Sequence, residues 1–487
     1  MKRLRLARSV MMTMGASLML AGCNLAPAYH PPVAPVPAGY KPIPGWQAAS
    51  PADMTARGSW WSLFNDPVLA GLEQRLDGAN PDLAAAVARH DAALAYAGQA
   101  RAALLPSAEL QGSATQNRQS QQRPLRGTDQ PDNYGADQIN GVIGYEIDLW
   151  GRLHNQLRSR QAMAQASDAD RAAIQLSLEA QLATDYMTLR GLDDRIHLLD
   201  LTVASYDRSH ALTQTLFNGK IAAQMDVSRA QVQLDNARIA AAQARADRAV
   251  MEDAVAVLVG EAPSTFQLPP AAAPPLPDVP VGLPATLLER RPDVASAERA
   301  VASANLGIGI ARAAFYPSLT LGALGGVQSQ GENPFKVGDL FWGLGPAVTL
   351  PIFEGGKLKA QLAQAQAKVR EASAHYRATV LTAFQQVEDN RAQLARLAQE
   401  AGSSQEAVTA AHQTADAALS LYSNGATSFL DVVTAQTALL QAQQAALDIR
   451  TRRLVASVGL VRALGGGWHT PFIDPTPAPA SKAALHP

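Results

Sequence analysis

The chain is built from two similar halves. The segment Asn80-Pro81-Asp82-Leu83 returns as Arg291-Pro292-Asp293-Val294, 211 residues later. Farther along, Met225-Asp226-Val227 pairs with Leu430-Asp431-Val432, 205 residues later. Solenoid repeats have periods of roughly 20–50 residues, so a period near 200 indicates a duplicated half.

Each half contains the same succession of elements. A helical segment of about 35 residues, at 66–103 and at 283–314, precedes two extended pieces and a long tract without proline. The extended pieces alternate: Ile139, Ile143 and Ile147 share one parity, and polar residues occupy much of the other. Alternation with period two predicts strands that have one apolar and one polar face.

Four strands in one chain cannot close a membrane barrel. Outer-membrane barrels need at least about eight strands, and open strand edges are not tolerated in lipid. Two chains would supply eight strands and three would supply twelve. The alternative is a soluble four-stranded sheet whose apolar face is buried under helices.

The tracts without proline predict very long helices. No proline occurs from Arg152 to Ala262 or from Ile352 to Thr470. Helices over 154–217 and 357–423 would reach roughly 90 Å at 1.5 Å per residue. Each is expected to turn at a glycine, Gly219 or Gly425, into a returning helix. A soluble helical bundle would also explain these helices, but it leaves the hairpins unexplained.

The N-terminus has the form of a secretory signal. Residues 1–22 have a basic start and an apolar stretch, and Leu20-Ala21-Gly22 precedes Cys23, the only cysteine. The sequence Leu-Ala-Gly-Cys resembles the bacterial lipoprotein cleavage box, which implies covalent lipid (diacylglycerol and an N-acyl chain) on Cys23. Asn24 then favours the outer membrane. The alternative is an ordinary signal peptide with a cysteine nearby by chance.

The composition argues against nucleic-acid binding and enzyme chemistry. The net charge is −1 and 17% of residues are charged, so no basic face for nucleic acid is expected. The nine histidines show no paired metal spacing. We therefore expect no catalytic residues, no metal and no cofactor besides the lipid.

Several motifs, in this order and in duplicated halves, resemble the TolC-like outer-membrane factor family, in its lipoprotein, NodT-type branch. The motifs that carry the resemblance are Tyr145-Glu-Ile-Asp-Leu-Trp-Gly-Arg152, Arg290-Arg-Pro-Asp-Val294, Phe315-Tyr-Pro-Ser-Leu319, Leu350-Pro-Ile-Phe-Glu-Gly-Gly356 and Tyr422-Ser-Asn-Gly-Ala-Thr-Ser-Phe-Leu-Asp-Val432.

The resemblance implies an α+β membrane protein. In that fold, three chains close a twelve-stranded β-barrel that continues into a long α-helical periplasmic tunnel. The expected organisation is a lipoprotein signal peptide (1–22), a lipid-anchored extended strap (23–58), a first repeat (59–262) with hairpin 104–151 and helix pair 154–262, a Pro-rich linker (263–282), a second repeat (283–467) with hairpin 315–353 and helix pair 357–465, and a flexible tail (468–487).

Two groups of residues have expected roles. The resemblance implies a swivel where strands become helices, at Pro106, Pro317, Pro351, Gly151 and Gly355. Proline suits such a position because it fixes φ and ends regular ladders. The resemblance implies a gate at the tunnel mouth, where Asp431 and Tyr422 match the family pattern and Thr427 and Thr434 occupy two further positions of it. Asp226 is the position in the first half that corresponds to Asp431.

The gate has an alternative interpretation. Three copies of Asp431 around an axis would form a negative ring. Thr427 and Thr434 stand where the family pattern has an arginine and a second acidic residue, which weakens the case for a salt-bridge latch. Ser428-Phe429-Leu430-Asp431 also reads as a capping box, which would by itself explain the aspartate.

The resemblance implies an exit duct for small molecules in a tripartite efflux pump. Its expected partners are two further copies of the chain, a periplasmic adaptor (membrane fusion protein), an inner-membrane pump that is usually proton-driven, and outer-membrane lipid. The alternatives are a channel for protein or peptide secretion and a structural coiled-coil lipoprotein that transports nothing.

Overall fold

We describe the protein from a computed structural model. The structure describes residues 24–37, 39–42, 59–122, 130–277, 279, 291–329 and 337–466. The signal peptide, Cys23, the C-terminal tail from residue 467 onward and parts of the strap and linker lie outside the described residues.

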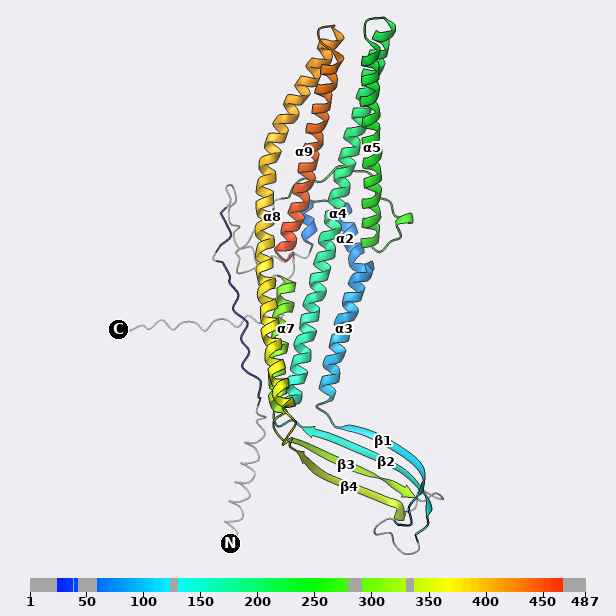
Figure 1. Ribbon diagram of the computed structural model, residues 1–487, viewed down its shortest axis with the longest axis vertical. Helices are drawn as coiled ribbons and strands as arrows, with labels where there is room; N and C mark the ends of the chain where they lie inside the picture. The colour runs from blue at the N-terminus through cyan, green and yellow to red at the C-terminus, as the bar shows by residue number, and fades with distance from the viewer. Residues whose placement is uncertain are drawn as a thin grey trace, which may run out of the picture. The chain divides into compact units, whose positions relative to one another are not determined.

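One four-stranded antiparallel sheet joins the two repeats (Figure 1). Its strands are β1 (Ser107–Arg118), β2 (Asn133–Ile147), β3 (Ser318–Ser329) and β4 (Leu340–Thr349), in that order across the sheet. The hairpin β1–β2 comes from the first repeat and β3–β4 from the second. Between β3 and β4 lies a short 3-10 helix, η3 (Val337–Asp339).

The strand register places all the alternating apolar residues on one face. Ile143 pairs with Ala108 on β1 and with Ala323 on β3, and Ala323 pairs with Leu344 on β4. Because neighbouring strands keep this parity, the apolar face is continuous across the sheet.

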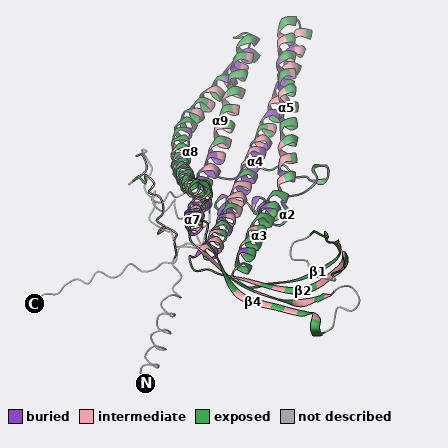
Figure 2. Cartoon of the chain, turned by 60° about the horizontal axis from the view of Figure 1, so that its bottom comes forward, coloured by how far each residue is buried: buried purple, intermediate pink, exposed green. Residues whose placement is uncertain are grey.

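None of the described helices buries this apolar face. Among the described strand residues only Asn140 is buried, and the rest are exposed or half-buried (Figure 2). Trp342 and Leu344 on β4 are 82% and 69% exposed. The alternative of a soluble sheet covered by helices is therefore wrong for this chain.

The tracts without proline form two pairs of long helices. The first members, α4 (Arg152–Asn218) and α8 (Lys357–Ser423), each have 67 residues and so a length of about 100 Å. The returning helices, α5 (Gln224–Leu258) and α9 (Phe429–Ala463), each have 35 residues. Small residues such as Ala230, Ala237 and Ala244 form the buried seam of α5, which lets neighbouring helices approach closely.

The helical segment expected at 66–103 is in fact two helices, α2 (Pro67–Ala79) and α3 (Pro81–Ala102). Asn80 separates them because its Oδ1 accepts hydrogen bonds from the N–H groups of Asp82 and Leu83, both at 2.9 Å. Asparagine at an N-cap followed by proline at N1 starts a new helix. In the second repeat the counterpart, α7 (Pro292–Ala313), also starts at a proline.

The described chain divides into two compact units, and each unit draws on both repeats. Unit 1 contains the sheet with the adjoining helix segments, and unit 2 contains residues 34–88, 169–295 and 377–487. The main core of unit 2 gathers the 3-10 helix η1 (Trp60–Phe64), α2, α4, α5 and α9. Its fully buried members include Phe64, Leu76, Leu182, Met187, Val255, Leu454 and Val458.

Candidate functional site

The turns that end α4 and α8 close in the same way. The N–H of Ile221 bonds the carbonyl of Leu216, and the N–H of Ala426 bonds that of Leu421, both at 2.8 Å. This bond, which spans five residues, belongs to the Schellman motif and needs a left-handed residue just before the donor.

The left-handed residues are Gly425, with φ of 73°, and Lys220, with φ of 60°. The chain turns at Gly219, as expected, since this residue directly follows α4, but the left-handed position is the next residue, Lys220. The hydrogen bonds align the halves at a displacement of 205, so Lys220 and not Gly219 corresponds to Gly425. A left-handed lysine costs roughly 1–2 kcal/mol, because its Cβ crowds the backbone.

The carboxylate of Asp431 accepts hydrogen bonds from the residues that precede α9. Its Oδ2 accepts from Thr427 Oγ1 at 2.6 Å, from Ser428 Oγ at 2.8 Å and from the Ser428 N–H at 3.2 Å. The Thr427 hydrogen bond, followed by that of the Ser428 side chain, lowers the pKa of Asp431 below its ordinary value. The contact expected from a capping box is thus present, and it includes Thr427.

Asp226, at the start of α5, lies near Tyr422 at the end of α8. Burial and then the charge of Asp226 raise the pKa of Tyr422, whose buried hydroxyl has no hydrogen-bond partner among the described residues. The Tyr422 ring packs on Phe429 with 5.1 Å between centroids. Arg229 Nη1 lies 3.5 Å from Asp226 Oδ1.

The structure therefore forms two groups from the five expected gate residues. Thr427 joins Asp431, and Tyr422 lies near Asp226. Thr434 joins neither, because its hydroxyl donates to the carbonyl of Leu430 in its own helix at 2.9 Å. Arg229 was missed in the sequence, although its place three residues after Asp226 on a helix gives a direct signal.

The expected swivel residues lie at the ends of the strands. Pro106 and Pro317 directly precede β1 and β3, and Pro351 lies two residues after the end of β4. Gly151 and Gly355, with φ of 70° and 57°, lie just before α4 and α8. These positions take left-handed backbone that other residues adopt at a cost.

Side chains tie the junction between β2 and α4. Trp150 Nε1 donates to the carbonyl of Pro317 at 2.7 Å, and its ring lies 4.6 Å from that of Tyr316. Glu146, near the end of β2, forms a two-pronged ion pair with Arg152, with N–O distances of 2.7 and 3.1 Å. The junction is therefore held by contacts between strand and helix residues.

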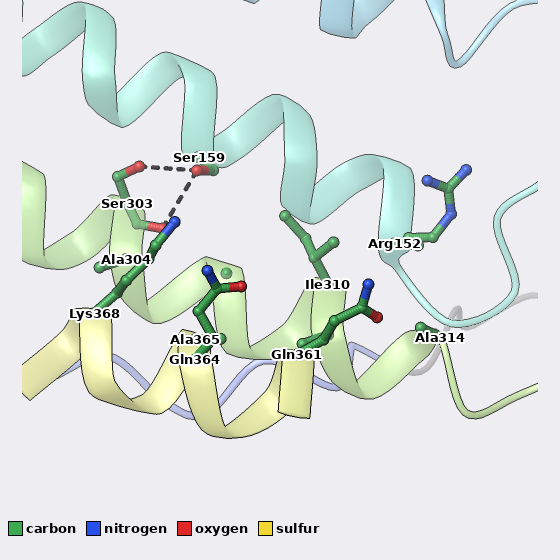
Figure 3. A pocket seen from close by; sticks show the side chains of 12 residues that line it. Arg152, Ser159, Ser303, Ala304, Ile310, Ala314, Gln361, Gln364, Ala365 and Lys368 are labelled. Atoms are coloured by element: carbon green, nitrogen blue, oxygen red, sulfur yellow. Dashed lines mark hydrogen bonds between the residues drawn. The ribbon is translucent and has the colours of Figure 1, made fainter. Parts of the chain in front are cut away.

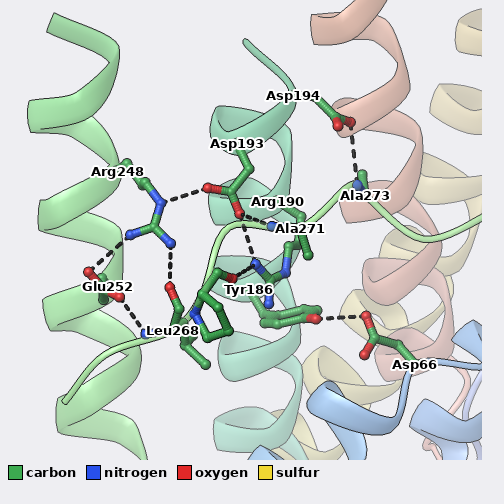
Figure 4. A network of polar contacts seen from close by, with 11 residues as sticks. Asp66, Tyr186, Arg190, Asp193, Asp194, Arg248, Glu252, Leu268, Ala271 and Ala273 are labelled. Carbon is green, nitrogen blue, oxygen red and sulfur yellow. Dashed lines mark hydrogen bonds and ion pairs between the residues drawn. The ribbon is translucent and has the colours of Figure 1, made fainter. Parts of the chain in front are cut away.

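A buried network in unit 2, which no sequence pattern predicted, holds the segment that joins the repeats (Figure 4). Asp193 on α4 accepts from Arg190 Nη1 at 2.8 Å and from Arg248 Nε at 2.6 Å. Arg190 also donates to the carbonyl of Pro269, and Arg248 donates to that of Leu268. Arginines on α4 and α5 thus hold the segment between the repeats by hydrogen bonds to its backbone.

The described residues contain neither a candidate metal cluster nor a candidate membrane-spanning helix. Within them no group of three His, Cys, Asp or Glu side chains could hold a metal ion. None of the described helices has a stretch long and apolar enough to span a membrane.

Comparison with known proteins gives consistent results. Residues 72–261 and 283–466 match the family described as outer membrane efflux protein. The probable efflux pump outer membrane protein TtgC of Pseudomonas putida is 32% identical over 471 residues, which cover 95% of this chain and 96% of the relative. The pyoverdine export outer membrane protein OpmQ of Pseudomonas aeruginosa is 31% identical over 465 residues, 93% of this chain and 96% of the relative.

Solved structures agree with these sequence matches. The outer-membrane channel OprN superposes with a TM-score of 0.84 at 28% identity, covering 92% of this chain and 100% of that chain. CusC, described as forming a transmembrane channel, has a TM-score of 0.80 at 25% identity, covering 91% of this chain and 100% of that one.

Proposed function

Because this chain belongs to the outer membrane efflux protein family, we propose that it is the passive exit duct of a tripartite pump. It is an efflux channel of the outer membrane with its helices in the periplasm, and the family and fold class predicted from the sequence are confirmed. Beyond membership of the family, we propose that the chain forms a homotrimer, has a lipid anchor on Cys23, conducts passively, and works with a periplasmic adaptor and an inner-membrane pump.

The main support for the proposal is that the four-stranded sheet is not covered by the described helices. Its apolar face has no helix over it, and within the described chain β1 pairs only with β2 and β4 only with β3. Unpaired strand edges are not tolerated in the hydrocarbon layer, so other copies must complete the sheet. Three copies give a closed barrel of twelve strands, within the size range of outer-membrane barrels.

The duct has no energy source of its own. The sequence around Gly355-Gly356-Lys357 lacks the first glycine of a phosphate-binding loop, and we propose that the chain is not an enzyme. The drive therefore comes from an inner-membrane pump, proton-driven in our proposal, through a periplasmic adaptor. The names of the relatives, which refer to antibiotic, toluene and pyoverdine efflux, support small molecules as cargo.

A transport assay in cells tests this function. Cells that carry the matching adaptor and pump but lack this chain should accumulate a fluorescent pump substrate, and expression of the chain should lower the accumulation again. A strain that keeps its dye efflux but loses a secreted polypeptide from the medium would replace efflux with secretion. A strain that loses neither would favour the structural lipoprotein.

A further inference from the structure

The first described residues of the chain lie along one face of α7. Asn305 Nδ2 donates to the carbonyl of Pro27 at 2.9 Å, and Arg312 Nη1 donates to that of Leu25 at 3.2 Å. We call this side of α7 the strap face. Its residues in contact with segment 24–29 are Glu298, Asn305, Gly309 and Arg312.

A hollow of about 520 Å³, lined by both polar and apolar residues, lies against α7, between α4 and α8 (Figure 3). We call this side of α7 the pocket face. Its residues that line the hollow are Ser303, Ala304, Gly307, Ile310, Ala311 and Ala314. From the neighbouring helices come Arg152 and Ser159 on α4, and Gln361, Gln364 and Lys368 on α8.

The two faces lie on opposite sides of the helix. At 3.6 residues per turn, the strap-face positions fall within an arc of about 60° and the pocket-face positions within one of about 120°. The centres of the two arcs are about half a turn apart. Helix α7 therefore separates the strap from the hollow, and all of these residues belong to unit 1.

We propose that the pocket face lines the conduit and that Lys368 gives it a positive charge that favours the passage of anions. This inference rests on the proposed function, including the lipid on Cys23. An anchor held in the membrane leaves the next residues on the lipid and periplasmic side of the duct. The strap face is then the outer face of α7, and the opposite face is the inner one.

The charge of the hollow follows from its lining. No carboxylate lines it, and the guanidinium of Arg152 is already paired with Glu146 at 2.7 Å. Lys368 is exposed, extends from α8 over α7 in Figure 3, and has no ion pair within the described chain. In a homotrimer three such amines would surround the axis, and a ring of positive charge lowers the energy of anions in a pore.

Reversing this charge tests the inference. The variant is Lys368→Glu, and Lys359→Glu is the matched control, because Lys359 is exposed and lies nearly half a turn away from the pocket side of α8. The measurement is the reversal potential of trimers in planar bilayers under a KCl gradient. We expect Lys368→Glu to raise the K⁺ over Cl⁻ permeability ratio by about twofold or more, and Lys359→Glu to leave it unchanged.

The outcomes separate the inference from the function beneath it. An unchanged ratio in Lys368→Glu, or an equal change in the control, would overturn the assignment of the inner face while wild-type currents still support a duct. Trimers that insert and never conduct, both as the wild type and as the double variant Asp226→Ala and Asp431→Ala, would overturn the proposed function itself.

Discussion

Two buried carboxyl groups, those of Glu73 on α2 and Glu179 on α4, lie in unit 2. Glu73 is fully buried, and neither of its carboxyl oxygens has a partner among the described residues. Burial, followed by the charges of Glu179 and Asp77, raises its pKa to about 10. Burial also raises the pKa of Glu179 to about 7, against the hydrogen bond from Trp60 at 2.8 Å. Glu73 is therefore protonated in the folded protein at pH 7.

The Glu73 carboxyl should make the protein less stable as the pH rises. The unfolded chain releases this proton above about 4.5 and the folded chain keeps it up to about 10, so the folded state binds more protons within that window. Glu73→Gln should remove this decrease of stability with rising pH, and it should raise the melting temperature at pH 8 by about 2–4 °C. The exposed Glu406→Gln is the control, and an unchanged slope in Glu73→Gln would contradict the assignment.

Asp431 can be tested for its two roles at once. Asp431→Ala removes the acceptor for Thr427 and Ser428, so hydrogen exchange in the first turn of α9 should speed up. If the three copies of Asp431 in a trimer also close the tunnel mouth, the conductance of the Asp431→Ala trimer should exceed that of the wild type. Asp226→Ala is the comparison, since that carboxylate bonds neither Thr427 nor Ser428. Faster exchange without a change in current would leave capping as the whole role of Asp431.

The capping of Asp431 should also weaken in acid. Its pKa is lowered in the folded state, so its contribution to stability is present above the pKa of the unfolded chain. That contribution is lost as the pH falls through the folded pKa.

At the scale of single elements, local patterns predicted much of the structure. The long helices were predicted within two residues of α4 and α8, because tracts without proline have no other regular fold at that length. The break at Asn80 also has a local signal, since asparagine followed by proline is typical of a helix start. Alternation predicted the strands, although β1 and β2 extend as far as Arg118 and from Asn133, beyond the residues whose alternation marks them.

Other features had no local signal. The network of Asp193 and Arg248 depends on contacts between residues 55 positions apart, which no periodicity encodes. The left-handed Lys220 depends on where α4 ends, and boundaries are the least certain part of a pattern. The apolar sheet face was predicted, whereas its lack of cover became visible only in three dimensions.

Two glycines of α7 form a matched pair for testing the strap. A Cβ on Gly309 would lie 2.7 Å from the Cβ of Ala26, whereas a Cβ on Gly307 meets nothing within 4 Å. Gly309→Ala should release residues 24–29 and speed up proteolysis there. Gly307→Ala should leave the strap bound and stabilise the helix by up to about 1 kcal/mol. Equal proteolysis in the two variants would contradict this packing.

The two faces of β4 should respond differently to charge. Leu344 lies on the apolar face and Ala347 on the other, so arginine at each position compares the faces on one strand. An arginine facing lipid costs roughly 2–4 kcal/mol at the middle of the membrane, and one facing the lumen is tolerated. We expect Leu344→Arg to reduce the yield of heat-resistant trimers on denaturing gels and Ala347→Arg to preserve it. The reverse order would assign the faces the other way round.

At the scale of the whole molecule, duplication and assembly are connected. One hairpin from each repeat meets at the β2–β3 pairing, so a single chain makes a continuous sheet out of two copies of one design. The same chain cannot complete that sheet, because β1 and β4 remain as edges. The duplication thus supplies four strands, and the remaining strands must come from other chains.

Several copies of this chain enclose a conduit in our proposal. The decisive measurement is the single-channel conductance of purified mature trimers in a planar bilayer, for the wild type and for the double variant Asp226→Ala and Asp431→Ala. We expect small discrete currents from the wild type and larger ones from the variant. Silence from both, in bilayers shown to contain inserted trimers, would show that the copies enclose no conduit.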